Sequence, residues 1–328
     1  MIPVAIVTGF LGSGKTTLIS RILRDPAFAR TAVIVNEFGE IGLDHELVAS
    51  SDETLLALTT GCLCCAVRSD LVATLLDLWR RRESDEVAYD RVLIETSGLA
   101  DPAPILHALM TDRDVAEHYA IDGIVTVIDT QFGVATLDRH PEASRQAALA
   151  DTLLLSKTDV VAPSDELMAR LNALNVTASR ANTQGISPIS LFTGTAVEQR
   201  LGQLPDLAAQ NPFATAQHSD GIDSFTLQRD RPIPALALTL LLEALAEHCG
   251  ARLLRMKGIV AIEEMPDQPA VIHGVQHVYS APEFLDRWSS ADRTSRMVFI
   301  AQGVPRHFPV RLLDAIEQEV REEMARSG

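Results

Sequence analysis

The sequence lacks several features that define large classes of protein. It has only four cysteines in 328 residues, and three of them, Cys62, Cys64 and Cys65, lie too close together for a disulfide scaffold. No apolar stretch reaches the roughly 20 residues that cross a bilayer. No basic segment precedes the apolar start of the chain, as a secretion signal requires. These absences predict a cytoplasmic globular protein without a membrane span.

Positive charge is also scarce. The chain has 28 lysines and arginines against 44 aspartates and glutamates, which gives a formal net charge of −16. Such a charge opposes nucleic-acid phosphates and anionic membrane surfaces, so we expect neither as a partner. Solubility is the simplest explanation of this acidity, and attraction of cations is the second. Because hydrophobic residues make up 47% of the chain, it can bury a substantial core.

Short β-branched runs alternate with helical patterns up to about residue 205, and several of these runs are apolar throughout. Continuous apolar strands are typical of parallel sheets that are covered on both faces. The candidate strands are Val4–Val7, Ala32–Val35, Arg91–Ile94, Gly123–Ile128, Thr152–Leu155 and Ser187–Phe192. Asp70, and Asp101 followed by Pro102, are predicted to cap two of the intervening helices. The predicted fold is therefore α/β, with a doubly wound, mostly parallel sheet.

Periodicity is lost in a segment rich in turn formers, which predicts a boundary between two domains. We predict a first domain over residues 1–210, a linker over 211–221 and a second, smaller α+β domain over 222–328. The strands expected in the second domain are 224–227, 253–262, 270–279 and 296–301, and the helices are 235–248, 282–288 and 309–324. Their order suits ferredoxin-like connections.

The first candidate site is a glycine-rich loop between an apolar strand and a helix. Residues 9–16, Gly-Phe-Leu-Gly-Ser-Gly-Lys-Thr, match the pattern GxxxxGK[ST] of a phosphate-binding loop, or P-loop. Its main-chain amides are expected to surround phosphate oxygens, Lys15 to reach the β- and γ-phosphates, and Thr16 to bind Mg²⁺. The predicted nucleotide-binding residues of this loop are Gly9, Gly12, Ser13, Gly14, Lys15, Thr16 and Thr17.

Besides Thr16, a P-loop protein needs an acidic residue that organises Mg²⁺, usually at the end of a neighbouring strand. Glu95 follows the apolar run that begins at Arg91. Glu95 is predicted to hold Mg²⁺ through water or to orient the attacking water. Gly98 is expected to bring its main-chain amide close to the γ-phosphate. Lys15, Glu95 and Gly98 are thus the predicted catalytic residues, and a solvated acid at the strand end is the alternative for Glu95.

Ser156-Lys-Thr-Asp159 follows a later apolar strand and is similar to the guanine-reading pattern NKxD, with serine in place of asparagine. Asp159 would accept hydrogen bonds from guanine, and the stem of Lys157 would stack on the base. These residues favour GTP, although an ordinary turn at the strand end is the alternative.

The cysteine cluster is a separate candidate site. Cys62, Cys64 and Cys65 can converge on one soft or borderline cation, and Zn²⁺ is favoured, with Co²⁺ or Cu⁺ as alternatives. Three cysteine ligands leave one of the four positions of a tetrahedral ion without a protein ligand, which suits a metal that is transferred to another protein. Glu37 or Glu40 is expected to add an oxygen ligand to either metal. Buried structural cysteines and a redox-sensing cluster are the other interpretations.

These motifs together resemble those of the CobW-type GTPases, relatives of the nickel GTPases of hydrogenase and urease maturation. The motifs that carry the resemblance are Gly9–Thr17, Asn36–Glu40, Gly61–Cys65, Glu95–Pro102, Ser156–Asp159 and, in the second domain, residues 255–258 and 269–276. The resemblance implies slow GTP hydrolysis coupled to binding of Zn²⁺ and its delivery to a client metalloprotein. Ser156 departs from the expected asparagine, and no histidine-rich storage stretch is present.

The leading hypothesis is therefore a GTP-driven metallochaperone. The alternatives are a P-loop ATPase or kinase that acts on a small molecule and holds structural zinc, and a binding module whose cysteines sense oxidants. His273 and His277 fall in one predicted strand about 13 Å apart, too far to chelate one ion. Cys249 is predicted to lie in the core. The sequence assigns neither a client nor an oligomeric state, and a homo-oligomer is left open.

Overall fold

The computed structural model describes residues 1–36, 55–58, 64–184, 186–187, 221–288 and 290–327, with only the backbone described at 36, 55–58, 64–68 and 327. The chain divides into two compact units. One holds Met1–Asn172 and Ala178–Gly194, and the other holds Ala173–Thr177 and Thr195–Gly328. Of the predicted linker, 211–221, only Gly221 is among the described residues. No helix in the described part of the chain is both long and apolar enough to span a bilayer.

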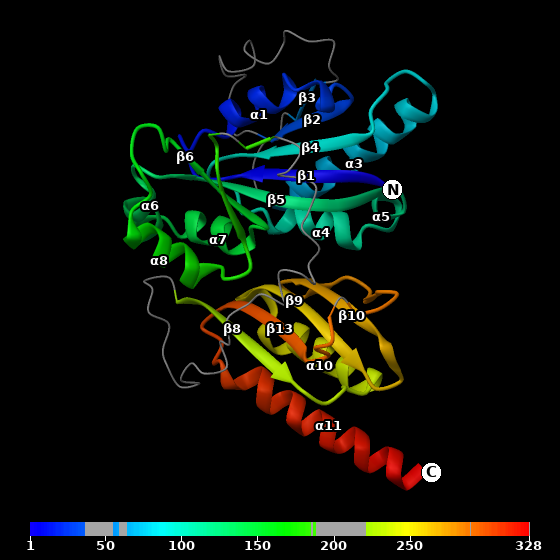
Figure 1. Cartoon of the computed structure of the whole chain (residues 1–328). Coiled ribbons are helices and arrows are strands. Elements are labelled where there is room, and N and C mark those ends of the chain that lie inside the picture. The colour runs from blue at the N-terminus through cyan, green and yellow to red at the C-terminus, as the bar shows by residue number, and fades with distance from the viewer. Residues whose placement is uncertain (37–54, 59–63, 185, 188–220, 289, 328) are drawn as a thin grey trace. The chain divides into compact units, whose positions relative to one another are not determined.

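The first unit is built on a seven-stranded sheet in which every neighbouring pair is parallel, and its order is β3-β2-β4-β1-β5-β6-β7 (Figure 1). The strands are β1 (Ile2–Thr8), β2 (Thr31–Asn36), β3 (Leu55–Leu58), β4 (Arg91–Thr96), β5 (Tyr119–Asp129), β6 (Thr152–Ser156) and β7 (Ser179–Asn182). Because the strands are parallel, their carboxyl ends meet at one edge of the sheet. The loops that follow them therefore emerge together.

Helices cover both faces of this sheet, which explains why its central strands are apolar throughout. The helices are α1 (Lys15–Leu23), α3 (Cys64–Glu83), α4 (Ala103–Thr111), α5 (Arg113–His118), α6 (Gly133–Arg139), α7 (Pro141–Leu149) and α8 (Asp165–Leu174). Helix α1 packs its buried Leu18, Ile19 and Ile22 against alternate strand residues such as Val7 and Val127. Helices α3, α4 and α5 pack on one another at the opposite face (Figure 1). The predicted doubly wound sheet is confirmed.

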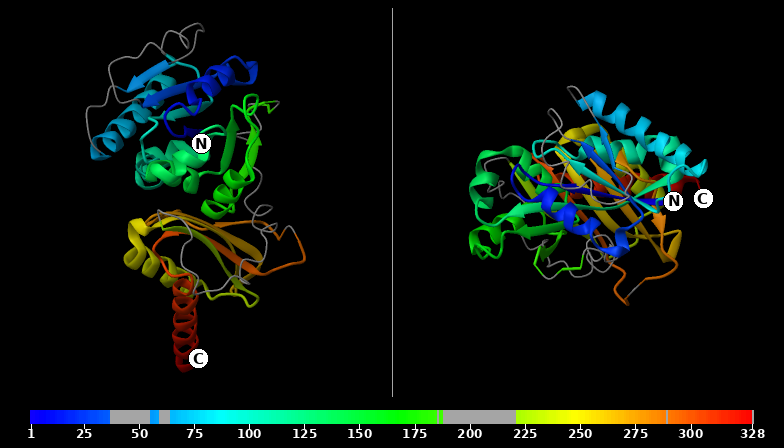
Figure 2. Two further views of the ribbon diagram at one scale, coloured as in Figure 1. Left: turned by 90° about the vertical axis from the view of Figure 1, so that its left-hand side faces the viewer. Right: turned by 90° about the horizontal axis from the view of Figure 1, so that it is seen from above.

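The second unit contains a mostly antiparallel sheet of order β11-β10-β9-β13-β8, with β12 paired to β10. Its elements are β8 (Ile222–Arg229), α10 (Ala235–Cys249), β9 (Leu253–Ile262), β10 (Met265–Val275), β11 (Val278–Tyr279), β12 (Glu283–Phe284), β13 (Ser295–Gln302) and α11 (His307–Ser327). Helices α10 and α11 pack together on one face, where Leu241, Met256, Phe299 and Leu313 share a core (Figure 2). The predicted smaller α+β domain is confirmed.

Several local predictions in the second unit are wrong. The predicted strand 270–279 is broken by a turn, where Gln276 adopts a φ of 56°, and its two parts pair as a hairpin. His273 therefore lies in β10 and His277 in the turn that follows it, so the two histidines do not share one extended strand. Residues 282–288 contain the short strand β12 and no helix. The residues described between β10 and β13 contain no helix, and α11 follows the last strand, so the connections are not ferredoxin-like.

In the first unit, the structure corrects one helix start and adds two strands. The helix predicted to be capped by Asp70 begins six residues earlier, at Cys64, and the main-chain carbonyl of Asp70 accepts from the Thr74 hydroxyl inside it. No glycine or proline separates Cys64 from Asp70, so nothing stops the helix from starting earlier. Strands β3 and β7 were not predicted. Of the predicted strand 187–192, only Ser187 is described, and it belongs to no strand.

Candidate functional site

The P-loop connects β1 to α1, as the motif predicted. Gly9, Gly12 and Gly14 have φ values of 141°, 71° and 100°, which side-chain-bearing residues rarely adopt. A Cβ atom on Gly9 would lie 2.4 Å from the carbonyl oxygen of Val127 in β5. Glycine at position 9 is therefore required by both the backbone angle and the close approach of the neighbouring strand.

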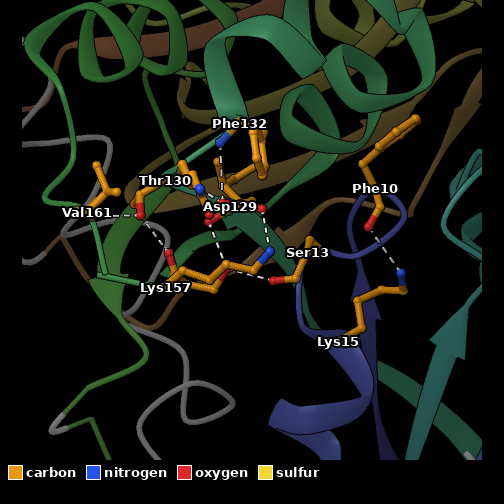
Figure 3. Close-up of polar contacts among 11 residues, drawn as sticks. Phe10, Ser13, Lys15, Asp129, Thr130, Phe132, Lys157 and Val161 are labelled. Atoms are coloured by element: carbon orange, nitrogen blue, oxygen red, sulfur yellow. Dashed lines mark hydrogen bonds and ion pairs between the residues drawn. The ribbon is translucent and has the colours of Figure 1, made fainter. Parts of the chain in front are cut away.

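Polar groups inside the loop suit a bound phosphate. The Lys15 ammonium group donates to the carbonyl of Phe10 at 3.3 Å, which holds it across the loop (Figure 3). The hydroxyl of Ser13 is buried, and it has no hydrogen-bond partner within the described ranges. A phosphate oxygen would satisfy this donor, and the N-terminus of α1 adds partial positive charge at the same place.

Thr16 and Glu95 are 79 residues apart in the sequence but lie in contact. The Thr16 hydroxyl donates to Glu95 Oε1 at 3.1 Å, and the Glu95 side chain is only 8% exposed. Strand pairing explains the contact, because β4 lies beside β1 with Glu95 opposite Val7. A hydroxyl and a carboxylate are oxygen ligands of the type that Mg²⁺ prefers, so the pair fits the ion that the P-loop motif implies.

The loop after β4 forms a tight turn against the P-loop. The amide of Ala100 donates to the carbonyl of Ser97 at 3.0 Å, and the amide of Leu99 donates to the Ser97 hydroxyl at 3.4 Å. A Cβ atom on Gly98 would lie 2.7 Å from the main-chain nitrogen of Leu11 in the P-loop. The two predicted phosphate-binding segments are thus in direct backbone contact at Gly98.

Ser156, Lys157 and Asp159 border a cavity of about 530 Å³ beside the P-loop. Gly14, Thr17 and Arg21 contribute to the same cavity, together with Thr183 and Gln184 from the loop after β7. No sequence pattern had indicated Thr183 or Gln184. The cavity lies next to the phosphate loop and is large enough for a nucleoside, since small-molecule pockets begin at roughly 300 Å³.

Within this cavity, Ser156 and Lys157 have protein partners that the sequence did not predict. The Ser156 hydroxyl donates to the carbonyl of Ser13 at 2.6 Å. The Lys157 ammonium group, on a residue with φ of 56°, pairs with Asp129 Oδ2 at 2.6 Å (Figure 3). Asp129 is the last residue of β5, and Glu95 is the last but one of β4, so the position of Asp129 at the end of an apolar strand was the available signal. Asp129 thus fixes the direction of the Lys157 side chain.

The predicted metal ligands lie largely outside the described part of the chain. Glu37, Glu40 and Cys62 are not described, and Cys64 and Cys65 are described only as the first two residues of α3. The site formed by these residues stays a prediction. Among the residues with described side chains, no cluster of three or more His, Cys, Asp or Glu side chains could hold a metal ion.

Cys249 is buried at 5% exposure, as predicted for a core residue. It lies at the end of α10 in the second unit. Burial raises the pKa of its thiol, which disfavours the thiolate that metal ligation needs.

Comparison with known proteins decides the family. Residues 3–183 match the model described as CobW/HypB/UreG, nucleotide-binding domain, and residues 222–317 match the cobalamin synthesis protein cobW C-terminal domain. The chain belongs to the CobW/HypB/UreG family. The CobW-type P-loop GTPase predicted from the sequence is thereby confirmed, together with its two-part fold.

Two bacterial zinc chaperones are similar to this chain over most of their length. The zinc chaperone YjiA of Escherichia coli is 32% identical over 306 residues, which cover 93% of this chain and 95% of the relative. The zinc chaperone CobW of a Sinorhizobium species is 29% identical over 301 residues, covering 81% and 83% of the two chains. A crystal structure of Zn(II)-bound YjiA GTPase from E. coli has a TM-score of 0.75 at 26% identity, with 96% and 98% covered.

Proposed function

We propose that this P-loop GTPase couples GTP hydrolysis to the binding of Zn²⁺ through Cys62, Cys64 and Cys65 and to its delivery to a client metalloprotein. The observation that carries the proposal is topological. The P-loop follows β1, the cysteine segment follows β3 and enters the first turn of α3, and the turn that contains Gly98 follows β4. All three strands are parallel members of one sheet, so their following loops share one edge.

The described residues support specific roles in the GTPase step. The P-loop amides and Lys15 would hold the β- and γ-phosphates, and Thr16 and Glu95 would hold Mg²⁺, which offsets charge on the transferred phosphoryl group when it is bound. Gly98, pressed against the P-loop, would offer its amide to the γ-phosphate. Asp159, exposed at the mouth of the cavity, would accept hydrogen bonds from guanine.

Zinc chaperones among the relatives support the metal as cargo. Losing the γ-phosphate would relax the loops after β2, β3 and β4 together, because they meet at one edge. Relaxation of the β3 loop would change the geometry of the three thiolates and so the affinity for Zn²⁺. Co²⁺ is the alternative cargo by ligand type.

The domain division predicted from the sequence belongs to the same proposal. A nucleotide-binding domain over residues 1–210, a linker over 211–221 and a CobW-type C-terminal domain over 222–328 are supported by the family matches at 3–183 and 222–317. We assign the nucleotide and metal chemistry to the first of these domains.

The test is zinc affinity, measured by competition with a chromophoric chelator in the presence of GTP analogue, GDP or no nucleotide. Loss of a residue that only hydrogen-bonds to a metal ligand typically weakens metal binding by ~10–100-fold. Cys64→Ala removes a proposed ligand itself, so we expect a larger loss of Zn²⁺ affinity. Lys15→Ala is expected to abolish nucleotide binding and to leave zinc affinity without nucleotide unchanged. Cys249→Ala, which removes a buried thiol elsewhere, is the matched control.

Coupling must be reciprocal, so Zn²⁺ should change the affinity for GTP by the same factor by which GTP changes the affinity for Zn²⁺. Equal zinc affinity in all three nucleotide states would show that the two sites are independent. Equal binding of ATP and GTP would instead favour a small-molecule ATPase or kinase. Reversible disulfide formation without hydrolysis would favour an oxidant sensor.

A further inference from the structure

Gln146 connects α7 to the turn that follows β4. Its side chain is fully buried in α7, and its Nε2 donates to the carbonyl of Gly98 at 3.2 Å and to that of Ala100 at 2.9 Å. A primary amide has two N–H donors, and both are used here on two carbonyls of one turn. A single side chain therefore holds this turn at two points.

Gln146 is itself held by the strands that carry the nucleotide site. Its main-chain carbonyl accepts from the hydroxyl of Thr126 in β5 at 2.8 Å. Thr126 lies opposite Thr8, the last residue of β1 before the P-loop, and Thr8 accepts from the Thr96 hydroxyl of β4 at 2.7 Å. The anchor of Gln146 is thus part of the same buried framework as the P-loop and the β4 loop.

The polar identity of Gln146 is not explained by packing. Its Oε1 is buried and has no hydrogen-bond partner among the residues that the structure describes. An unsatisfied buried acceptor costs roughly 1–3 kcal/mol, and an apolar side chain of similar shape would avoid that cost. A glutamine at this position is accounted for by its two donors.

The two hydrogen bonds from Gln146 determine how Gly98 faces the P-loop. In the turn, the amides of Leu99 and Ala100 donate to Ser97, and the carbonyls of Gly98 and Ala100 accept from Gln146. With the peptide groups on both sides of Leu99 held in this way, the turn cannot rotate without breaking buried hydrogen bonds. Gly98 is then fixed against Leu11, on the side of the phosphate loop.

We propose that Gln146 is a positioning residue for the GTP-bound state, which holds the Ser97–Ala100 turn so that the Gly98 amide meets the γ-phosphate. The proposal rests on the proposed GTP hydrolysis at this P-loop. Its side-chain amide contacts the turn itself, so Gln146 acts through Gly98. GDP has no γ-phosphate, so its binding does not use this contact.

The decisive variant is Gln146→Met, which keeps the length of the side chain and removes both donors. We expect kcat for GTP to fall by about 10–100-fold, the effect of two lost hydrogen bonds in the reactive complex. The affinity for a non-hydrolysable GTP analogue should weaken as well, whereas the Kd for GDP should stay within about twofold of wild type. Gln318→Met, at an exposed position in α11, is the matched control and should leave all values unchanged.

A second variant keeps the test valid if Gln146→Met does not fold. In Gln146→Glu, the carboxylic acid can donate to one carbonyl only while it is protonated. Its kcat relative to wild type should therefore rise as the pH falls from about 8 to about 6, while its Kd for GDP relative to wild type stays the same at every pH; a purely structural defect would change both. An activity ratio that does not change with pH in Gln146→Glu would overturn the proposal.

Two other results would also overturn it: equal weakening of GDP and GTP-analogue binding in Gln146→Met, or a kcat that stays within about twofold of wild type. Failure of the proposed function looks different, because the wild-type chain would then hydrolyse no GTP. The ratio of analogue to GDP affinity still reports on Gln146 in that case.

Discussion

The hydroxyl of Ser156 donates a 2.6 Å hydrogen bond to the main-chain carbonyl of Ser13. This contact joins the end of β6 to the P-loop across 143 residues of sequence. The same hydroxyl lies 3.3 Å from the carbonyl of Ile128 in β5, so the Ser13 carbonyl of the loop is the nearer of its two acceptors. Ser156 is only 5% exposed, and this contact holds the P-loop in place beside the cavity.

Ser156→Ala is therefore expected to weaken the binding of GTP and ATP by a similar factor, about 3–10-fold for one buried hydrogen bond. The ratio of the two affinities should not change. Asp159→Asn is the contrasting variant, because it removes the acceptor for guanine and should lower the preference for GTP over ATP. Competition binding with labelled GDP measures both effects. A changed GTP-to-ATP ratio in Ser156→Ala would show that the serine contacts the base.

The sequence predicted the centre of the first sheet because burial there is complete. Strands β1, β4, β5 and β6 are apolar on both faces, and each was recognised from its apolar run. Strand β7 escaped prediction because Ser179–Asn182 is only partly buried and mostly polar. The four-residue β3 escaped because a short apolar run is equally compatible with a helix.

Site residues were predictable where they belong to a local pattern. Gly9, Lys15 and Thr16 belong to a contiguous motif, and Glu95 lies near the end of a recognisable strand. Gln146 belongs to no such pattern, and it acts on Gly98, 48 positions away. Asp129 ends an apolar strand, but its partner Lys157 lies 28 positions away. Strand order and helix packing bring such partners together, and no short sequence pattern shows which distant residues will meet.

Gly9→Ala is predicted to be far more damaging than Gly12→Ala. Both positions have positive φ, which costs an alanine about 1–2 kcal/mol. A Cβ atom on Gly12 meets nothing within 4 Å, whereas on Gly9 it would lie 2.4 Å from a main-chain oxygen of β5. We expect Gly9→Ala to cost about 1–3 kcal/mol more in the free energy of unfolding. Urea unfolding of both variants gives the difference, and equal losses would mean that β5 moves aside freely.

A buried pair of tyrosines in the first unit predicts loss of stability at alkaline pH. Tyr119 and Tyr89 share a hydrogen bond of 2.6 Å between their hydroxyls, and that of Tyr119 donates to the carbonyl of Leu75 in α3 at 2.8 Å. Burial raises the pKa of both tyrosines. The unfolded chain releases these protons near pH 10 and the folded chain only at higher pH.

It follows that this contribution to stability is complete below about pH 10 and is lost as the pH rises above it. Tyr119→Phe should lower the free energy of unfolding at neutral pH by about 1 kcal/mol and make the alkaline decline shallower. Tyr279→Phe is the control at neutral pH, because the Tyr279 hydroxyl is buried without a partner among described residues. Urea unfolding from pH 8 to pH 11 tests both; an alkaline decline of wild-type steepness in Tyr119→Phe would contradict the assignment.

The start of α3 at Cys64 predicts how the metal would affect the fold. Two of the three proposed thiolate ligands occupy the first turn of this helix, where the helix dipole favours negative charge. Zn²⁺ bound there would fix the first turn and reduce its fraying, because fewer open states remain compatible with ligation. Removal of zinc with a chelator should therefore speed amide hydrogen exchange in the first two turns of α3. Exchange in α10, whose Cys249 is not a ligand, should stay the same, and unchanged protection at the start of α3 would place the metal elsewhere.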